Sequence, residues 1–367
     1  MRAPQRTVVA MSGGVDSSVS AALETQRGGE VVGLSMQLIG VRAGQAESRC
    51  CAPDDLRDAR RVAETLRIPH FVLDFEDEFR RHVLSYFENE YRRGRTPIPC
   101  VPCNSTLKFG RLLERARGLG AARVVTGHYA RVDHLPGQGR YRLRTGVDAE
   151  RDQSYFLFDL TQEQLAAAVF PLGGLRKAEV RELARSFDLP VAEKPESRDL
   201  CFIGSGDYRD SLARSSEEAG EIVDREGLVL GRHDGISGFT VGQRRGLGVA
   251  GGRRLYVLAL DAARQRVVVG EEQEQYASAV EASRANWISP APPARGRRAL
   301  ARVRYRHAGA YGWVSPLAGD GFRVDFEAPL RAPAPGQAVV LYDGDEVIGG
   351  GWIDRAVGAA APGARRN

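Results

Sequence analysis

The fold of this chain is decided near its start by the stretch Ala10-Met11-Ser12-Gly13-Gly14-Val15-Asp16-Ser17-Ser18. It follows a β-branched run at residues 7–9 and precedes a helical pattern over residues 17–26. A strand, a Gly-rich turn and a helix start together form an anion site. Glycine lets backbone N–H groups turn inward, and the helix dipole favours negative charge. The stretch lacks the Gly-Lys-Ser/Thr ending of a Walker A loop, so it predicts a different kind of phosphate loop. An ordinary strand-to-helix connection is the alternative.

Length and composition set the outer bounds. The chain has 367 residues, enough for two or three domains with their own cores. Its apolar runs fall well short of the roughly 20 residues that a membrane helix needs, and we expect no signal peptide because a strand pattern begins at residue 7. We therefore expect a cytoplasmic protein without membrane contact. A net charge of +5 is compatible with a polyanionic partner, although only Lys108, Lys177 and Lys194 are lysines.

Strand and helix patterns alternate over the first 135 residues, which predicts a doubly wound parallel sheet. The expected strands are residues 7–9, 31–38, 71–75 and 124–126, and the expected helices are residues 17–26, 53–66, 76–91 and 104–119, the last capped by Asn104. Ligands bind beyond the carboxyl ends of the strands in such sheets. Residues 10–18, Met36, the 100–104 turn and Gly127-His128 are therefore expected to share one crevice.

The second half of the chain has a different character. Beyond residue 221 it contains short β runs and many glycines, and residues 280–356 predict a small β-barrel. We therefore expect an α/β domain that carries the Gly-rich phosphate loop at 1–205, a β-rich middle domain at 206–278 and a C-terminal β-barrel at 279–357. Residues 358–367 are expected to form a disordered tail.

Five cysteines, an odd number, do not indicate a disulfide framework. Cys100 and Cys103 form a Cys-x-x-Cys pair, Cys50 and Cys51 are adjacent, and Cys201 stands alone. Structural zinc, an iron–sulfur cluster and thiol chemistry are the three candidate uses. Cys103 is expected at a helix N-terminus, where the dipole lowers the pKa of a thiol and suits it to nucleophilic attack.

The Ser-Gly-Gly-x-Asp-Ser pattern resembles the PP-loop of the ATP-pyrophosphatase superfamily, whose members cut ATP between the α- and β-phosphates. An ordered set of further motifs resembles one family within it, the bacterial tRNA-specific 2-thiouridylases. These motifs are Thr96-Pro97-x-Pro99-Cys100-x-x-Cys103-Asn104, Thr126-Gly127-His128-Tyr129-Ala130, Asp152-Gln153-Ser154-Tyr155-Phe156-Leu157, Cys201-Phe202-Ile203-Gly204, Phe239–Leu247, Arg302–Arg306, Pro335-Gly336-Gln337 and Gly349-Gly350-Gly351. The resemblance extends to about Asp354.

The resemblance implies ATP-dependent 2-thiolation of the wobble uridine, position 34, of tRNA. Adenylation of the uracil C2 oxygen makes it a good leaving group, and sulfur then attacks C2. The residues that should hold ATP are Ala10, Met11, Ser12, Gly13, Gly14, Val15, Asp16, Ser17, Met36 and Gly127. Mg²⁺ is expected to accompany ATP, with Asp16 near the departing pyrophosphate. We predict no separate protein-bound metal.

The resemblance also assigns two cysteines. Cys201 would carry the sulfur as a persulfide, and Cys103 would be the nucleophile that releases it or assists its transfer, ending in a transient Cys103–Cys201 disulfide. A sulfur-relay or cysteine-desulfurase protein would supply the sulfur.

RNA contacts follow from the same resemblance. The turn Ile98-Pro99-Cys100 is expected beside the flipped base of the anticodon loop. The family usually has Asn where this chain has Ile98, and some members have Asp where it has Cys100. Further tRNA contacts are expected from His128, Arg151, Asp152, Gln153, Arg304, Tyr305 and Gln337. Alternate arginines in the run 295–306 are expected to line one face of a strand and meet phosphates.

Two other functions remain compatible with parts of the sequence. One is another PP-loop AMP-transferring ligase or tRNA-modifying enzyme, and the other is an iron–sulfur-dependent tRNA thiolase. The Cys103/Cys201 arrangement favours sulfur transfer over the first of these. A monomer is the expected state.

Overall fold

The computed structural model describes residues 6–39, 53–195, 218–249, 254–289 and 296–358. Cys50, Cys51, Cys201, Arg295 and the tail from residue 359 lie outside these ranges. The chain divides into two compact units. We call Met1–Leu84, Pro99–Asp207 and Asp345–Val347 the α/β unit, and Ser85–Ile98, Tyr208–Gly344 and Ile348–Asn367 the β-rich unit.

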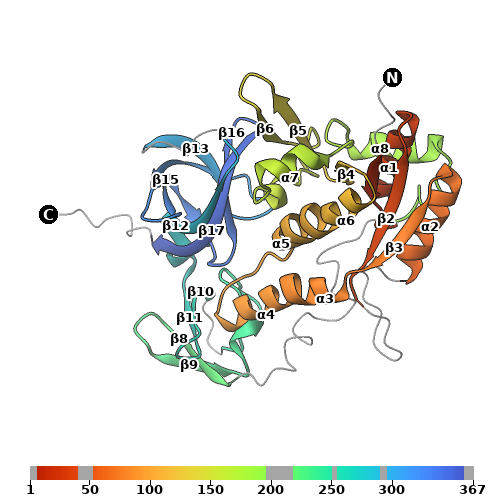
Figure 1. Ribbon diagram of the computed structural model, residues 1–367. Helices are drawn as coiled ribbons and strands as arrows, with labels where there is room; N and C mark the ends of the chain where they lie inside the picture. Colours follow the sequence, from red (N-terminus) through yellow and green to blue (C-terminus); the bar gives the residue numbers. More distant parts are fainter. Residues whose placement is uncertain (1–5, 40–52, 196–217, 250–253, 290–295, 359–367) are drawn as a thin grey trace. The chain divides into compact units, whose positions relative to one another are not determined.

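The α/β unit is built on a five-stranded sheet in the order β3-β2-β1-β4-β7, in which every neighbouring pair is parallel (Figure 1). This confirms the predicted doubly wound parallel sheet. Its elements are β1 (Thr7–Ala10), α1 (Val15–Gln26), β2 (Val31–Gln37), α2 (Pro53–Leu66), β3 (His70–Asp74), α3 (Glu76–Phe79), η1 (Arg80–Leu84), α5 (Cys100–Pro102), η2 (Cys103–Arg111), α6 (Leu112–Gly118), β4 (Arg123–Val125), β5 (Ala130–Leu135), β6 (Arg140–Thr145), η3 (Ser154–Leu157), α7 (Gln162–Ala167), β7 (Ala168–Val169) and α8 (Lys177–Ser186).

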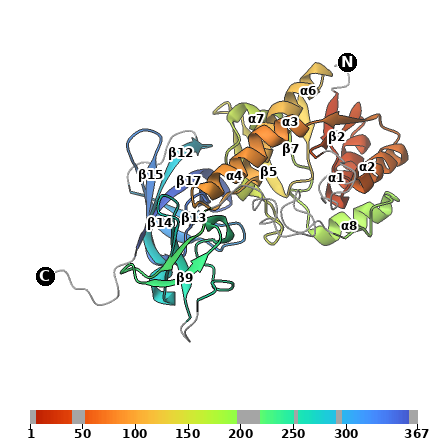
Figure 2. The ribbon, with the colours of Figure 1, turned by 90° about the horizontal axis from the view of Figure 1, so that it is seen from below.

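Helices cover both faces of this sheet. On one face α1, α2 and α8 share a core with β1, in which Val9, Val19 and Val62 are fully buried. Figure 2 shows α3 and α6 on the other side of the sheet. Helix α2 has the bounds that its sequence predicts, with Asp54 and Asp55 in the first turn, where acidic side chains favour a helix start. The central strand β1 is buried on both faces, as parallel strands between helices are.

The helix predicted at residues 104–119 begins earlier in the structure, at Cys100. Asn104 was expected to cap a helix, but the helical run starts at Cys100 and continues through η2 and α6, so Asn104 lies inside it. The Asn104 Nδ2 atom instead donates to the carbonyl of Phe156 at 3.2 Å. The earlier start follows from Pro99, which occupies the N-cap position with φ −64° and ψ −19° and so presets helical geometry.

The β-rich unit contains two sheets. One has the order β10-β11-β8-β9, and the other closes into a six-stranded barrel through β12-β15-β14-β13-β16-β17 and back to β12. The predicted C-terminal barrel is thus confirmed. The elements are α4 (Ser85–Arg92), β8 (Gly220–Val223), β9 (Val229–His233), η4 (Ile236–Gly238), β10 (Tyr256–Asp261), β11 (Arg266–Gly270), η5 (Glu272–Gln275), β12 (Tyr276–Trp287), β13 (Arg297–Arg302), β14 (Ala310–Pro316), β15 (Phe322–Arg331), β16 (Ala338–Asp343) and β17 (Glu346–Gly358), whose first two residues belong to the α/β unit.

Only part of the arginine-rich run predicted at residues 295–306 forms a strand. Strand β13 ends at Arg302, and Arg304 and Arg306 lie in the turn that follows. Arg306 has φ +62°, a left-handed conformation that ends the strand and so breaks the alternation of side chains. The expectation that these arginines share one strand face was therefore wrong beyond Arg302.

Candidate nucleotide and thiol site

The Gly-rich loop connects β1 to α1 as the sequence predicts. Gly14 occupies the N-cap of α1 and offers no capping side chain, so the first-turn N–H groups are available to an anion. The hydroxyls of Ser17 and Ser18 donate to the Gly14 carbonyl at 3.1 and 2.8 Å. The backbone N–H of Ser12 donates to Ser17 Oγ at 3.2 Å. These bonds fix the loop around the open helix end.

Two glycines let other segments approach this loop closely. Gly13 has φ +75°, and a Cβ atom there would lie 2.1 Å from the carbonyl oxygen of Asp55. Gly127, which follows β4, would place a Cβ atom 2.8 Å from the backbone nitrogen of Ser17 and from the carbonyl carbon of Asp16. Any side chain at either position would collide with backbone. The structure thus brings Gly127 and the Gly-rich loop together at the carboxyl edge of the sheet.

Asp16 is held by two partners from distant parts of the chain. Its Oδ1 atom accepts hydrogen bonds from Lys177 Nζ at 2.6 Å and from the Tyr129 hydroxyl at 2.8 Å. Burial raises the pKa of Tyr129, and the negative charge of Asp16 raises it further, so the phenol stays protonated and donates. This cluster places one fixed cation and one neutral donor at the first turn of α1.

A second lysine, Lys194, binds both the Gly-rich loop and α2. Lys194 Nζ donates to Asp55 Oδ1 and Asp58 Oδ2, both at 2.6 Å, and to the carbonyl of Gly13 at 3.0 Å. Burial alone would lower the pKa of Lys194, but the bonds to the two carboxylates outweigh it and raise the pKa. The ammonium therefore fixes the position of the loop glycine.

The two methionines assigned to ATP lie near the carboxyl ends of adjacent strands, Met11 directly after β1 and Met36 inside β2. Met11 is buried, and its backbone carbonyl accepts a hydrogen bond from Ser35 Oγ at 2.6 Å. Met36 is half-buried within β2, one residue before the end of that strand. A Cβ atom at Gly33 would lie 2.5 Å from Met11 Sδ, so the glycine makes room for that side chain.

Cys100 and Cys103 lie at the start of the α5–η2–α6 helical run. Cys100 is half-buried and Cys103 is buried, with 9% of its surface exposed. The backbone N–H of Cys103 donates to the Pro99 carbonyl at 3.1 Å, so Cys103 lies in the first turn, three residues beyond Cys100. The positive end of the helix dipole still acts there and favours a thiolate.

Three predicted RNA-contact residues of the α/β unit have internal partners. His128 is buried, with Nδ1 2.6 Å from Thr126 Oγ1, and burial lowers its pKa, so the imidazole is neutral at pH 7. Asp152 Oδ1 accepts from the N–H groups of Gly146 and Ser154 at 3.1 and 3.0 Å. Gln153 Oε1 accepts from the Tyr129 N–H at 3.1 Å. Arg151 is half-buried beside them.

The remaining predicted contacts belong to the β-rich unit. Gln337 Nε2 donates to the Thr96 carbonyl at 3.2 Å, and the Thr96 N–H donates to the Pro335 carbonyl at 2.8 Å. Ile98 is buried, so its side chain serves packing. Arg304 and Tyr305 lie in one turn, and Arg304 Nη2 donates to the Ala332 carbonyl.

Sequence reasoning gave no role to Tyr129, Lys177 or Lys194. One signal was available for the two lysines, because the chain has only three lysines among 52 basic residues. A chain that uses arginine almost everywhere keeps lysine where a compact ammonium is needed, and here two of the three contact the Gly-rich loop.

Three sections of the chain match described protein families. Residues 5–205 match the tRNA methyl transferase HUP domain, residues 211–271 the tRNA methyl transferase PRC-barrel domain and residues 277–353 the aminomethyltransferase β-barrel domain. The parallel sheet, the β-rich middle section and the closed barrel define the class as a three-part tRNA-modifying enzyme.

Close relatives narrow the class to one family. The chain is 51% identical over 361 residues to the tRNA-specific 2-thiouridylase MnmA of Geotalea uraniireducens, covering 96% of each chain. It is 50% identical to the protein of the same name from Geobacter metallireducens, covering 97% of this chain and 98% of that one. The chain therefore belongs to the tRNA-specific 2-thiouridylase family.

The described residues contain neither a membrane-spanning helix nor a cluster of metal-binding side chains. Helices there are all too short or too polar to cross a membrane. No group of three or more His, Cys, Asp or Glu side chains in the described ranges is arranged to hold a metal ion.

Proposed function

We propose that this chain uses ATP to adenylate the C2 oxygen of the wobble uridine of tRNA and then replaces that oxygen with sulfur. The observation that carries the proposal is the cluster at the start of α1, where Asp16, Tyr129 and Lys177 lie beside an uncapped helix end. This end supplies N–H donors and positive potential for a triphosphate.

The adenylation step needs charge stabilisation more than proton transfer. The uracil oxygen attacks the α-phosphorus, the α–β bond breaks and pyrophosphate leaves. Lys177 and the first-turn N–H groups of α1 stabilise the leaving pyrophosphate. Mg²⁺ bound with ATP would neutralise the same group, and the Asp16 carboxylate is the oxygen donor that fits it.

The sulfur step uses two thiols. The terminal sulfur of a Cys201 persulfide attacks C2 and AMP leaves with the former C2 oxygen. The Cys103 thiolate attacks the inner sulfur of Cys201, so the persulfide bond breaks and a Cys103–Cys201 disulfide forms. An external thiol must reduce that disulfide, and a persulfide-carrying donor protein must reload Cys201 in the cytoplasm.

Binding of the RNA is proposed to involve the Ile98–Pro99–Cys100 turn and the residues predicted from the sequence. Gln337 supports the turn indirectly, since its side chain holds the Thr96 carbonyl two residues before Ile98. Ile98 is buried and apolar, so no side-chain hydrogen bond to the base is proposed there.

The test is mass spectrometry of nucleosides from unmodified tRNA incubated with the protein, ATP, Mg²⁺, a persulfide-carrying sulfur donor and a thiol reductant. We expect 2-thiouridine only when ATP is present. An equal yield without ATP, or no 2-thiouridine from a protein that binds both ATP and tRNA, would overturn the proposal.

A further inference from the structure

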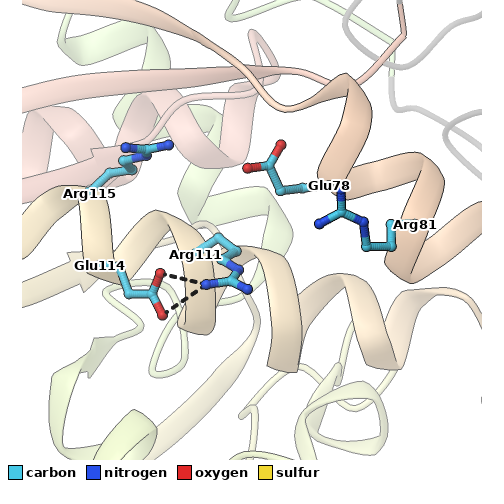
Figure 3. Close-up of a pocket in the computed structure, with 5 residues that line it drawn as sticks. All are labelled: Glu78, Arg81, Arg111, Glu114 and Arg115. Carbon is cyan, nitrogen blue, oxygen red and sulfur yellow. Dashed lines mark hydrogen bonds and ion pairs between the residues drawn. The ribbon is translucent and has the colours of Figure 1, made fainter.

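A cavity of the α/β unit is lined only by charged side chains. Its volume is about 220 Å³, and its lining residues are Glu78, Arg81, Arg111, Glu114 and Arg115. Figure 3 shows Glu78 and Arg81 on one helix, facing the other three residues on a second helix. The first helix is α3–η1 and the second is η2–α6, and these helices pack against each other. None of the five residues has a role in the reaction proposed above.

The charges in this cavity are not balanced. Arg111 Nη1 is paired with Glu114, at 3.0 Å from one carboxylate oxygen and 3.4 Å from the other. Within the described ranges, Arg81 and Arg115 make no ion pair closer than 4.0 Å, and both are exposed. The Glu78 carboxylate faces the same space, so three guanidinium groups and two carboxylates line the cavity and leave a net positive charge that favours an anion.

A neighbouring histidine supports the positive sign of the field. Burial lowers the pKa of His82, the charges of Arg111 and Arg81 lower it further, and the smaller opposing effect of Glu78 does not reverse the direction. Its Nε2 atom is buried without a hydrogen-bond partner among the described residues. The ring is therefore neutral at pH 7, and the positive field comes from the arginines.

We propose that Arg81 and Arg115 bind a backbone phosphate of the tRNA substrate. This rests on the proposed function. A phosphodiester offers tetrahedrally placed oxygens that can accept from guanidinium groups on two different helices, whereas a planar carboxylate fits one guanidinium fork. The observations therefore favour RNA over an acidic protein surface.

We call Arg81 and Arg115 the clamp. Its position fits a substrate whose base reacts near Cys103. Cys103 and Arg111 are the first and last residues of η2, a π-helical segment of 9 residues, so the cavity lies one short helix away from the thiol. The phosphate bound by Arg81 and Arg115 would thus belong to the anticodon arm, a few nucleotides from the target base.

The experiment compares two double variants of the full chain. Arg81→Gln/Arg115→Gln removes both unpaired guanidinium groups. Arg117→Gln/Arg123→Gln removes the same charge from α6 and from the amino end of β4, where Arg117 pairs with Glu163 instead of lining the cavity. The tRNA affinity is measured between about 50 and 200 mM salt, without turnover. Thermal midpoints and ATP affinity report whether each variant is folded.

For Arg81→Gln/Arg115→Gln we expect about 10-fold weaker tRNA binding and a salt slope smaller by about 1, with ATP affinity unchanged. The control pair should keep the slope of the wild type. Equal slopes for both variants would overturn the clamp. So would unchanged tRNA affinity combined with loss of sulfur transfer from a donor protein, since that assigns the cavity to a protein partner. A wild-type chain that binds tRNA but forms no 2-thiouridine would instead overturn the proposed function and leave the clamp standing.

Discussion

Lys177 Nζ lies 2.6 Å from Asp16 Oδ1, although 161 residues separate the two in the chain. The Lys177 side chain is largely shielded from water, with 12% of it exposed, whereas 34% of the Asp16 side chain is exposed. Tyr129 donates to the same oxygen, so the carboxylate and the ammonium are both held in place at the helix end before a nucleotide binds. In the proposed adenylation step, preorganised charge of this kind would lower the barrier to pyrophosphate departure.

Lys177→Met should lower the rate of tRNA-dependent pyrophosphate release by about 10²-fold or more, because the cation that stabilises the leaving group is lost. Pyrophosphate release under single-turnover conditions measures this step. Glu182→Gln, a change at an exposed position on the same helix α8, is the matched control and should be silent. Normal pyrophosphate release by Lys177→Met would remove this lysine from the adenylation step.

Gly127→Ala should weaken ATP binding and destabilise the fold by about 1–3 kcal/mol, because the new methyl group collides with the backbone of Asp16 and Ser17. Thermal unfolding and equilibrium ATP binding measure the two effects. Gly174→Ala is the control, since nothing lies within 4 Å of a Cβ atom there. If both variants bind ATP like the wild type, the close approach of Gly127 does not shape the site.

Lys194→Met should destabilise the chain by about 2 kcal/mol at neutral pH, because Asp55 and Asp58 lose their shared cation while partly buried. The pKa of Lys194 is raised above its usual 10.5. Its stabilisation is therefore fully present below pH 10.5 and is lost as the pH rises through the folded pKa.

The pH dependence supplies the test for Lys194. Urea unfolding of wild type and variant at about pH 8 and pH 11.5 should show the difference in unfolding free energy shrinking at the higher pH. A difference that stays constant, or that grows with pH, would show that the ammonium charge does not hold the loop.

Gln337→Ala should lower the stability of the β-rich unit by about 1 kcal/mol even without RNA, since its side chain holds the Thr96 carbonyl. Chemical unfolding without tRNA measures this. Gln138→Ala, at an exposed turn position, should have no effect. A Gln337→Ala variant with normal stability but weak tRNA binding would point to direct RNA contact instead of support for the turn.

The local elements were predictable where the sequence carries a local signal. The β-branched run at residues 7–9 and the following glycines predict β1, the loop and α1, and the acidic first turn predicts α2 at its observed bounds. The predicted Asn104 cap was wrong because Pro99 occupies the N-cap position, five residues before Asn104. A rigid proline at the helix start thus prevailed over a side-chain cap.

The partners of Asp16 and Gly13 could not be predicted from the sequence. Lys177 and Lys194 reach the Gly-rich loop from 161 and 181 residues away, and no periodic pattern encodes such pairings. The internal bonds of Asp152 and Gln153 were missed for the same reason, because a polar motif does not reveal whether it faces RNA or its own backbone. Their contacts with tRNA, like that of His128, stay predictions.

Cys201→Ser should abolish 2-thiouridine formation while tRNA-dependent pyrophosphate release survives, because only the sulfur step needs that thiol. Nucleoside mass spectrometry and a pyrophosphate assay on the same sample separate the two steps. Cys50→Ser serves as the control, since no role is assigned to that thiol. Thiolation at the normal rate by Cys201→Ser would rule out the persulfide at this position.

The central claim is that the uracil C2 oxygen leaves as part of AMP. Transcribing the tRNA with ¹⁸O at uridine O2 and analysing the AMP by mass spectrometry tests it most directly. The account predicts one labelled AMP for each 2-thiouridine formed. Unlabelled AMP, or label recovered in inorganic phosphate or pyrophosphate, would contradict it.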